Sequence, residues 1–220
     1  MYTMAVFKPN LTSKNLLKYS EQAMKDEKQI LDLGTGSGFI ALELKRKYPN
    51  KLVYGSDLSS ESIAEATNKA KEANLEIDFR TGSLFDPWIG MTFDFIINDV
   101  SGISNQLTSL GDWFTDIPCD SGLDGTDLTL SFLQNVKDFL LPKGLILTPL
   151  LSLSNIEKVE LFIQNNFSDY RLLGEEFVPL PKLDEKLSQL IKHLSTSKTI
   201  KVFNIAGVTF FSTKFLAIKV

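Results

Sequence analysis

The segment ILDLGTGSGF, residues 30–39, decides the fold of this chain. Its apolar run ends at a series of alternate glycines, Gly34, Gly36 and Gly38. Apolar residues then recur at helical spacing until Pro49 ends the pattern. A strand, a glycine turn and a helix in this order allow a ligand to lie against the backbone of the turn.

Two further features narrow the kind of ligand. A dinucleotide-binding turn would carry glycine or alanine where the bulky Phe39 stands, and the loop has no lysine for a phosphate. Asp32 stands two residues before Gly34, and the next strand ends at Asp57, 23 positions after Gly34. A carboxylate at that place can accept both hydroxyls of a ribose. The ordinary alternative for Asp57 is an N-cap of the following helix.

Strands and helices alternate along most of the chain, which predicts a parallel sheet covered on both faces. We expect a Rossmann-like, doubly wound, mostly parallel seven-stranded sheet with an antiparallel edge hairpin. The expected helices beyond the glycine loop are 60–73, 126–140 and 155–167. The expected strands are 29–33, 51–56, 75–80, 93–98, 145–151, 170–178 and two within 199–220 that meet near Ala206-Gly207.

The length of 220 residues and a hydrophobic fraction of 43% suit one substantial core, so we expect a single domain over residues 1–220. A leading helix is expected at 12–26 and a helical insertion at 182–195. Residues 101–125 show no regular pattern. A stretch of that length inside a compact domain is usually functional or disordered, and we assign it as a substrate loop.

Composition excludes several classes of protein. A net charge of -4 and a pI near 5.1 provide no general attraction for nucleic acid. The single cysteine, Cys119, cannot form an internal disulfide, and no Cys or His spacing suits zinc, so no metal site is expected. No stretch has the apolar length of a signal peptide or of a spanning helix. These features predict a soluble, cytoplasmic protein without a membrane partner.

The glycine loop with its preceding acid resembles motif I of the class I S-adenosylmethionine methyltransferases. Over roughly residues 6–151 the chain is most similar to the HemK-like, release-factor glutamine methyltransferases. The segments that carry this resemblance are Val6-Phe7-Lys8-Pro9, the glycine loop, Ser83-Leu84-Phe85-Asp86, the strand 93–98, Gly122-Leu123-Asp124-Gly125 and Leu141-Pro142-Lys143-Gly144.

The resemblance implies S-adenosylmethionine as the cofactor and assigns residues to its parts. Asp32 would lie near the ammonium of the methionine moiety, Asp57 at the ribose, and Ser83 with Leu84 at the adenine. An acid is usual where Ser83 stands, and serine accepts only one weaker hydrogen bond there. The full cofactor set is Asp32, Gly34, Thr35, Gly36, Gly38, Asp57, Leu58, Ser83, Leu84 and Asn98.

The family signature after the fourth strand is Asn-Pro-Pro-Tyr, and only Asn98 of this chain matches it. Asp99 and Val100 stand in place of the prolines, and Ser101 in place of the aromatic ring. The resemblance implies that Asn98 accepts hydrogens from the nitrogen that is methylated, and we expect Asp99 to assist. The catalytic candidates are therefore Asn98 and Asp99, and the substrate-binding candidates are Ser101, Trp113 and Phe114.

The stretch between Arg80 and Lys137 contains no basic residue and eight aspartates. About half of these aspartates would serve as caps and turns, which aspartate favours. A face of this charge should still repel a polyanion and attract a cation, so we expect no nucleic acid as substrate.

Three functions fit these residues. The leading interpretation is a methyltransferase that N-methylates an amine or amide of a small molecule or of a peptide. A protein-glutamine N-methyltransferase of release-factor type is the nearest alternative. The altered signature also fits a catalytically inactive, S-adenosylmethionine-binding regulatory or scaffold protein. The oligomeric state stays open.

Overall fold

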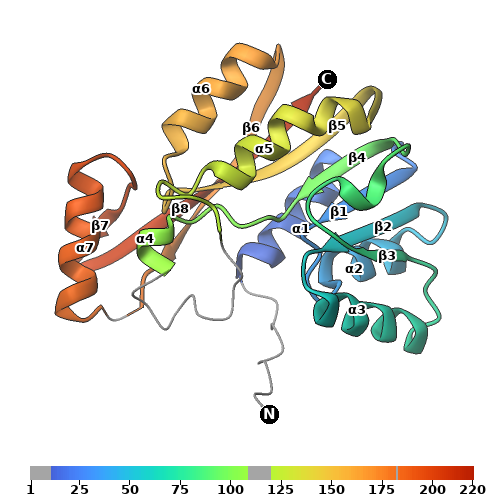
Figure 1. Ribbon diagram of the computed structural model, residues 1–220, viewed down its shortest axis with the longest axis horizontal. Coiled ribbons are helices and arrows are strands. Elements are labelled where there is room, and N and C mark those ends of the chain that lie inside the picture. Colours follow the sequence, from blue (N-terminus) through green and yellow to red (C-terminus); the bar gives the residue numbers. More distant parts are fainter. Residues whose placement is uncertain (1–10, 109–119, 182) are drawn as a thin grey trace.

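A computed structural model describes residues 11–108, 120–181 and 183–220, in which strands and helices alternate (Figure 1). No helix in these ranges is both long enough and apolar enough to cross a membrane. The helices are α1 (Leu11–Ala23), α2 (Phe39–Lys47), α3 (Ser60–Glu72), α4 (Asn105–Thr108), α5 (Asp127–Asn135), α6 (Ile156–Asn166) and α7 (Glu185–Thr196), with 3-10 turns η1 (Asp86–Trp88) and η3 (Val136–Phe139). The strands are β1 (Gln29–Leu33), β2 (Leu52–Asp57), β3 (Asp78–Thr81), β4 (Phe93–Asn98), β5 (Leu140–Leu151), β6 (Asp169–Pro179), β7 (Phe203–Ile205) and β8 (Val208–Lys219).

The strands form one sheet in the order β3-β2-β1-β4-β5-β8-β6, and β7 pairs with β8. β1 to β5 pair in parallel, whereas β8 runs antiparallel to β5, β6 and β7. The prediction of a Rossmann-like, mostly parallel sheet with an antiparallel edge hairpin is confirmed, but in the described residues the sheet has eight strands rather than seven, because the short β7 also pairs with β8. In the observed order β8 lies inside the sheet between β5 and β6, so that β6 forms the outer edge.

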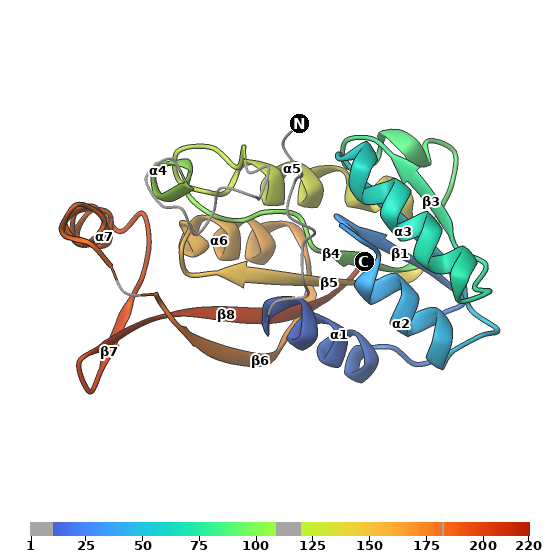
Figure 2. The same cartoon turned by 90° about the horizontal axis from the view of Figure 1, so that it is seen from below.

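Helices cover both faces of the sheet, with α5 and α6 on one side and α1 and α2 on the other (Figure 2). Alternate residues of the central strands supply the two cores, because successive side chains of a strand point to opposite faces. The first core includes Leu33, Ile96, Phe132 and Val159. The second core includes Leu16, Ile30, Leu44 and Ile97.

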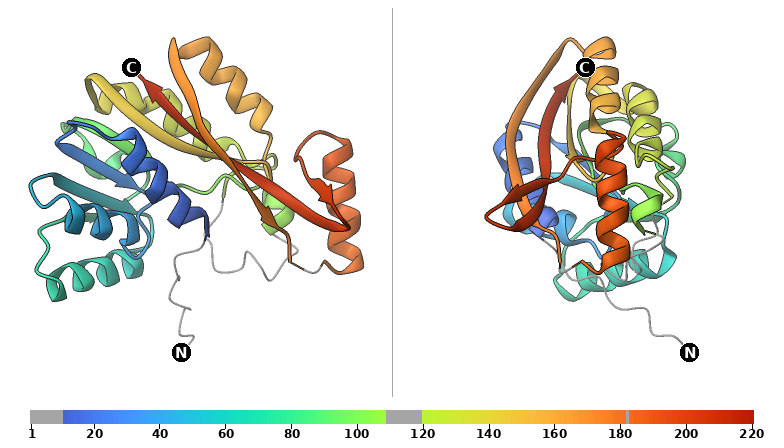
Figure 3. Two further views of the ribbon diagram at one scale, coloured as in Figure 1. Left: turned by 180° about the vertical axis from the view of Figure 1, so that it is seen from behind. Right: turned by 90° about the vertical axis from the view of Figure 1, so that its left-hand side faces the viewer.

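A third core lies beyond the end of the parallel part of the sheet, where α7 packs beside α4 (Figure 3). It joins α7 to the segment that follows β4 and to the start of β8. Its buried members are Ile103, Leu107, Leu153, Leu180, Ile191, Leu194, Ile200 and Phe211.

Several boundaries differ from the sequence-based expectations. The helix expected over 126–140 ends at Asn135 and tightens into η3, a common way to finish a helix. β5 begins at Leu140 because that residue pairs with Phe93, and the register shifts before Leu145 pairs with Phe95. The hairpin turn lies at Ala206 and Gly207, whose φ angles are 49° and 82°.

Candidate functional site

The carboxyl ends of β1, β2 and β4 meet at one level of the sheet. Leu33 pairs with Ser56 on one side and with Asn98 on the other. Sheet order changes direction at β1, since β2 follows it on one side and β4 lies on the other. Ligands of open α/β sheets bind at such a point.

The glycine loop closes over the end of β1. The backbone N–H groups of Gly34 and Thr35 both donate to the carbonyl oxygen of Ser56, at 2.8 and 2.9 Å. Gly34 has a φ of 85°, and a Cβ there would lie 2.7 Å from the carbonyl oxygen of Asp99. At Gly36, with a φ of 53°, no atom lies within 4 Å of the Cβ position. The loop is therefore packed against the turn after β4 at Gly34 and open at Gly36.

Asp32 lies beneath the loop and is fully buried. Its Oδ2 accepts hydrogen bonds from Thr35 Oγ1 at 2.6 Å and from the N–H of Ala41 at 3.2 Å. Its Oδ1 has no hydrogen-bond partner among the described residues. Burial raises the pKa of Asp32 to about 7, against the lowering effect of those two hydrogen bonds. A cation placed close to this carboxyl would favour its ionised form.

Asp57 joins the glycine loop to the start of α3. Its Oδ2 accepts from the N–H of Gly36 and its Oδ1 from the N–H of Ser59, both at 2.9 Å. Ser59 is the N-cap of α3, because its hydroxyl accepts from the N–H of Ser62. The alternative interpretation of Asp57 as that N-cap is therefore wrong. The carboxylate is partly exposed, with acceptor capacity left on each oxygen.

Asn98 ends β4 with its side chain buried, and Asp99 follows it. Asn98 Nδ2 donates to Thr148 Oγ1 at 3.0 Å, and its Oδ1 lies 3.5 Å from the N–H of Val100. The backbone N–H of Asp99 donates to the carbonyl of Leu33 at 2.8 Å. Burial raises the pKa of the Asp99 carboxyl well above its usual range, and the charges of Asp32 and Asp57 raise it further. Asp32, Asp57 and Asp99 thus place three carboxyl groups at this part of the sheet edge, and burial favours the protonated forms of Asp32 and Asp99.

The residues expected at the adenine make fewer contacts with the glycine loop than Asp32 and Asp57 do. The N–H of Gly82 donates to the carbonyl of Asp57 at 3.0 Å, which brings the end of β3 to β2. Ser83 is exposed, while Leu84 has a φ of 41° and packs against the first core. Leu58 is 65% exposed, so its side chain is free to contact a ligand.

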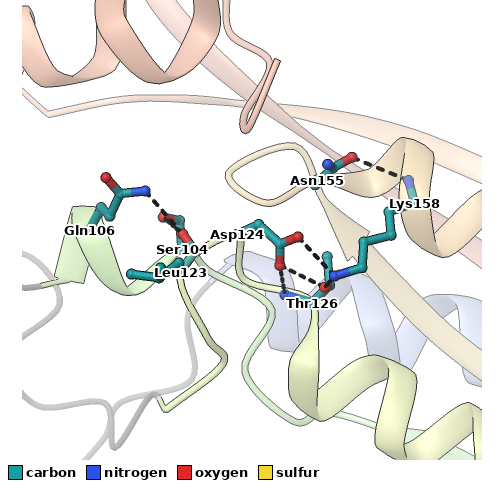
Figure 4. Close-up of polar contacts among 7 residues, drawn as sticks. All are labelled: Ser104, Gln106, Leu123, Asp124, Thr126, Asn155 and Lys158. Carbon is teal, nitrogen blue, oxygen red and sulfur yellow. Dashed lines mark hydrogen bonds and ion pairs between the residues drawn. The ribbon is translucent and has the colours of Figure 1, made fainter. Parts of the chain in front are cut away.

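The two ends of the expected substrate loop, residues 101–125, are hydrogen-bonded to each other and to α6 (Figure 4). Ser104 Oγ donates to the carbonyl of Leu123 at 2.6 Å, and Lys158 Nζ lies 2.9 Å from Asp124 Oδ2. The carbonyl of Ser101 accepts from Ser121 Oγ at 2.9 Å. Trp113 and Phe114 lie outside the described residues.

The structure brings most of the expected cofactor residues together. Asp32, Thr35 and the glycines share one loop, Asp57 is bonded to that loop, and Asp99 lies against it. Ser83 and Leu84 follow Gly82, whose N–H links the end of β3 to β2. Sequence reasoning missed Thr148, although a lone polar residue in the apolar run 145–151 is a signal that could have identified it.

These residues fit S-adenosylmethionine. The unpaired Oδ1 of Asp32 and the carboxylates of Asp57 and Asp99 suit a ligand that carries an ammonium and a sulfonium. The open space at Gly36, which a Cβ would occupy, is suited to close approach of a ligand. Asp57 retains acceptor capacity for ribose hydroxyls.

The pKa of Asp32 predicts a pH dependence with a definite sign. Between the usual pKa of 3.8 and the folded value of about 7, the folded protein holds a proton that the unfolded chain has released. The contribution of Asp32 to the free energy of unfolding is therefore largest below about pH 4 and is lost as pH rises through about 7.

Because a bound cation favours the ionised form of Asp32, binding of S-adenosylmethionine should release a proton near neutral pH. The affinity should therefore rise as pH rises through about 7. Calorimetry in two buffers of different ionisation enthalpy measures this proton release. Asp32→Asn, which cannot titrate at this position, is the matched control and should lower the proton release, with the remainder coming from Asp99. Equal proton release from both proteins would contradict the role of Asp32.

Replacing Asp57 by alanine should weaken binding of S-adenosylmethionine by roughly 1 to 3 kcal/mol, because the ribose hydroxyls lose their acceptor. The loss of the hydrogen bond to Gly36 also contributes. Calorimetric titration gives the affinity, and thermal unfolding reports the stability. Ser59→Ala, which removes the N-cap of α3, should do the reverse and lower stability with little change in affinity. Identical effects of the two substitutions would refute the distinction.

Comparison with known proteins adds independent information. A family model described as a methyltransferase domain matches residues 30–108. A release factor glutamine methyltransferase of Bacillus cereus is 28% identical over 144 residues, which are 60% of this chain and 49% of that protein. The enzyme of the same description from Staphylococcus aureus is 33% identical over 81 residues, or 37% of this chain and 29% of that protein. The chain thus spans about half the length, or less, of these relatives.

Solved structures share the fold at low sequence identity. Coclaurine N-methyltransferase bound to N-methylheliamine and SAH is 15% identical, with a TM-score of 0.56 over 99% of this chain and 77% of that one. A T. thermophilus 16S rRNA methyltransferase in complex with AdoMet and guanosine is 16% identical, with a TM-score of 0.58 over 97% of this chain and 44% of that one. Residues 30–108 therefore match a methyltransferase domain, for which S-adenosylmethionine is the fitting cofactor, and the sequence of the chain is similar to that of the HemK-like release factor glutamine methyltransferases.

Proposed function

From this methyltransferase domain, we propose that the chain is an N-methyltransferase that acts on an amine or amide nitrogen of a small molecule or a peptide. The observation that carries the proposal is the buried amide of Asn98, whose oxygen faces the turn after β4 beside the glycine loop. A carbonyl oxygen accepts hydrogen bonds from a nitrogen nucleophile and can orient its lone pair. The relatives that are release-factor methyltransferases support a peptide or protein as one form of the acceptor.

The chain's own residues divide into two groups. The glycine loop, Asp32 and Asp57 would hold S-adenosylmethionine, which supplies a methyl group on a sulfonium when bound. Asn98 and Asp99 would act on the acceptor. Burial raises the pKa of Asp99, which makes its carboxylate a stronger base and suits it to take a proton from an ammonium.

Charge supports the exclusion of nucleic acid as the acceptor. No lysine or arginine occurs between Arg80 and Lys137, and this stretch includes β4 and both flanks of the expected substrate loop. Phosphate contacts normally supply most non-specific affinity for nucleic acid. Salt-sensitive binding of RNA or DNA at residues 101–125 would overturn this part of the proposal.

The second candidate function is a catalytically inactive protein that binds S-adenosylmethionine as a regulator or a scaffold. The observation that favours it is the replacement of the two prolines and the tyrosine of the family signature by Asp99, Val100 and Ser101. These residues provide no aromatic platform for a planar amide.

Two measurements separate the candidates. Calorimetric titration with S-adenosylmethionine and its demethylated product should give micromolar-range dissociation constants, as an order of magnitude for a metabolite site. Transfer of a labelled methyl group to a panel of amines and glutamine-bearing peptides should then be measured, with RNA as a comparison. Transfer to nitrogen supports the leading proposal. Binding without transfer supports the inactive protein, and absence of binding by folded protein contradicts both.

A further inference from the structure

The side chains of Asn98, at the end of β4, and Thr148, within the neighbouring strand β5, form a buried pair. Ile97 of β4 pairs with Leu147 of β5, so the next residues, Asn98 and Thr148, lie side by side. Asn98 is 1% exposed and Thr148 is fully buried. The hydrogen bond from Asn98 Nδ2 to Thr148 Oγ1 is 3.0 Å long. This contact joins the strand that carries the candidate catalytic amide to the strand behind it.

The hydrogen-bond partners of the Asn98 amide, Val100 and Thr148, indicate where its oxygen and its nitrogen point. A backbone N–H can only donate, and the N–H of Val100 lies 3.5 Å from the oxygen of Asn98, which faces the turn after β4. The nitrogen then faces β5, where a hydroxyl can accept from it. An apolar side chain at position 148 would leave this buried donor without a partner, which is costly.

The oxygen of Asn98 retains capacity for a further hydrogen bond. The separation of 3.5 Å from the N–H of Val100 is at the outer limit for a hydrogen bond. A carbonyl oxygen also has two lone pairs, and the bond to Val100 uses one of them. The Asn98 amide is thus held by a hydrogen bond at its nitrogen, while its oxygen makes only one weak hydrogen bond with the described residues and can accept another.

We propose that Thr148 is a positioning residue that holds the Asn98 amide with its oxygen toward the acceptor. The amide in this orientation favours a nucleophile that bears hydrogens, such as an amine or amide nitrogen. A carboxylate oxygen can only accept hydrogen bonds, and the amide oxygen of Asn98 has no hydrogen to donate to it. The inference rests on the proposed function, and it adds the residue that selects the chemistry of the acceptor.

Sinefungin provides a direct probe, because it carries an amino group in place of the transferable methyl, on a carbon that replaces the sulfur of S-adenosylmethionine. It therefore presents N–H donors where the transferred methyl would lie. Its dissociation constant is compared by calorimetry with that of S-adenosylhomocysteine, which has no group at that position. The comparison is made for the unmodified protein, for Thr148→Val, which keeps the shape, and for Thr148→Ser, which keeps the hydroxyl.

The unmodified protein and Thr148→Ser should prefer sinefungin over S-adenosylhomocysteine. In Thr148→Val that preference should fall by about tenfold, as expected for loss of a hydrogen bond to a charged group, while affinity for S-adenosylhomocysteine changes less than about twofold. An unchanged preference in Thr148→Val overturns the inference while the proposed function stands. If the unmodified, folded protein binds neither compound, the proposed function itself fails.

A second measurement, on the unmodified protein, tests the same inference if Thr148→Val does not fold. The side-chain amide resonances of Asn98, assigned by their loss in Asn98→Ala, should shift more with sinefungin than with S-adenosylhomocysteine. One of the two amide protons should also exchange slowly because it is bonded to Thr148. Equal shifts with both compounds, or two rapidly exchanging protons, would overturn the inference.

Discussion

Replacement of Asn98 by alanine should lower the rate of methyl transfer by on the order of 100-fold, with the cofactor dissociation constant changed less than about twofold. The amide is buried at the end of β4 and does not contact the described residues of the glycine loop through any hydrogen bond. An interaction that is made chiefly in the transition state affects turnover more than binding. Steady-state kinetics and calorimetry on the same preparation measure the two quantities.

Stability has to be followed in the same experiment. The Asn98→Ala variant leaves Thr148 without its partner, which costs about 1 to 3 kcal/mol when the group is buried. Asn135→Ala, on the far end of α5 with an exposed side chain, is the matched control and should leave the rate unchanged. A normal rate in Asn98→Ala would exclude the amide from catalysis. A parallel loss of cofactor binding would show that it holds the cofactor instead.

Replacement of Gly34 by alanine should destabilise the protein by more than about 2 kcal/mol and remove most cofactor binding. Its φ of 85° is costly for any residue with a Cβ, and that Cβ would lie 2.7 Å from the backbone carbonyl of Asp99. Backbone cannot move aside as a flexible side chain can. The loop and the turn after β4 would therefore have to separate, which disturbs both halves of the site.

Gly90 provides the control for this experiment. It has nearly the same φ, 84°, but no atom lies within 4 Å of its Cβ position. Gly90→Ala therefore measures the cost of the backbone conformation alone, about 1 to 2 kcal/mol. Chemical unfolding of both variants, with calorimetry for the cofactor, separates that cost from the clash at Gly34. Equal destabilisation of the two would mean that contact with Asp99 contributes nothing.

The order of elements was predictable because each element carries its own local signal. The glycine loop marks the end of β1, and apolar runs bounded by polar residues mark β2 and β4. The position of β8 inside the sheet could not be predicted in this way. Pairing between β5 and β8 joins residues that are far apart in sequence, and local patterns do not define which strands become neighbours.

The candidate site was predictable only where a motif fixes the spacing. Asp32, the glycines and Asp57 follow from such a motif. The hydrogen bond between Asn98 and Thr148 spans 50 positions and depends on the register of β4 and β5, which single-sequence patterns do not define. The sequence-based alternative for the cap of α3 was Asp57 alone, and the geometry shows that Ser59 receives the N–H of Ser62.

The third core has a consequence for how the molecule opens. It is smaller than the other two and joins α7 to α4 at one end of the sheet, so it has fewer apolar contacts to lose in a local unfolding event. Amide protons of α7 are therefore expected to exchange with solvent earlier than those of β1 and β4. Ile103 and Leu107 belong to this core and follow Asn98 by a few residues. We therefore expect the third core, with the segment that follows Asn98, to unfold locally as a cooperative unit while β1 and the glycine loop stay folded.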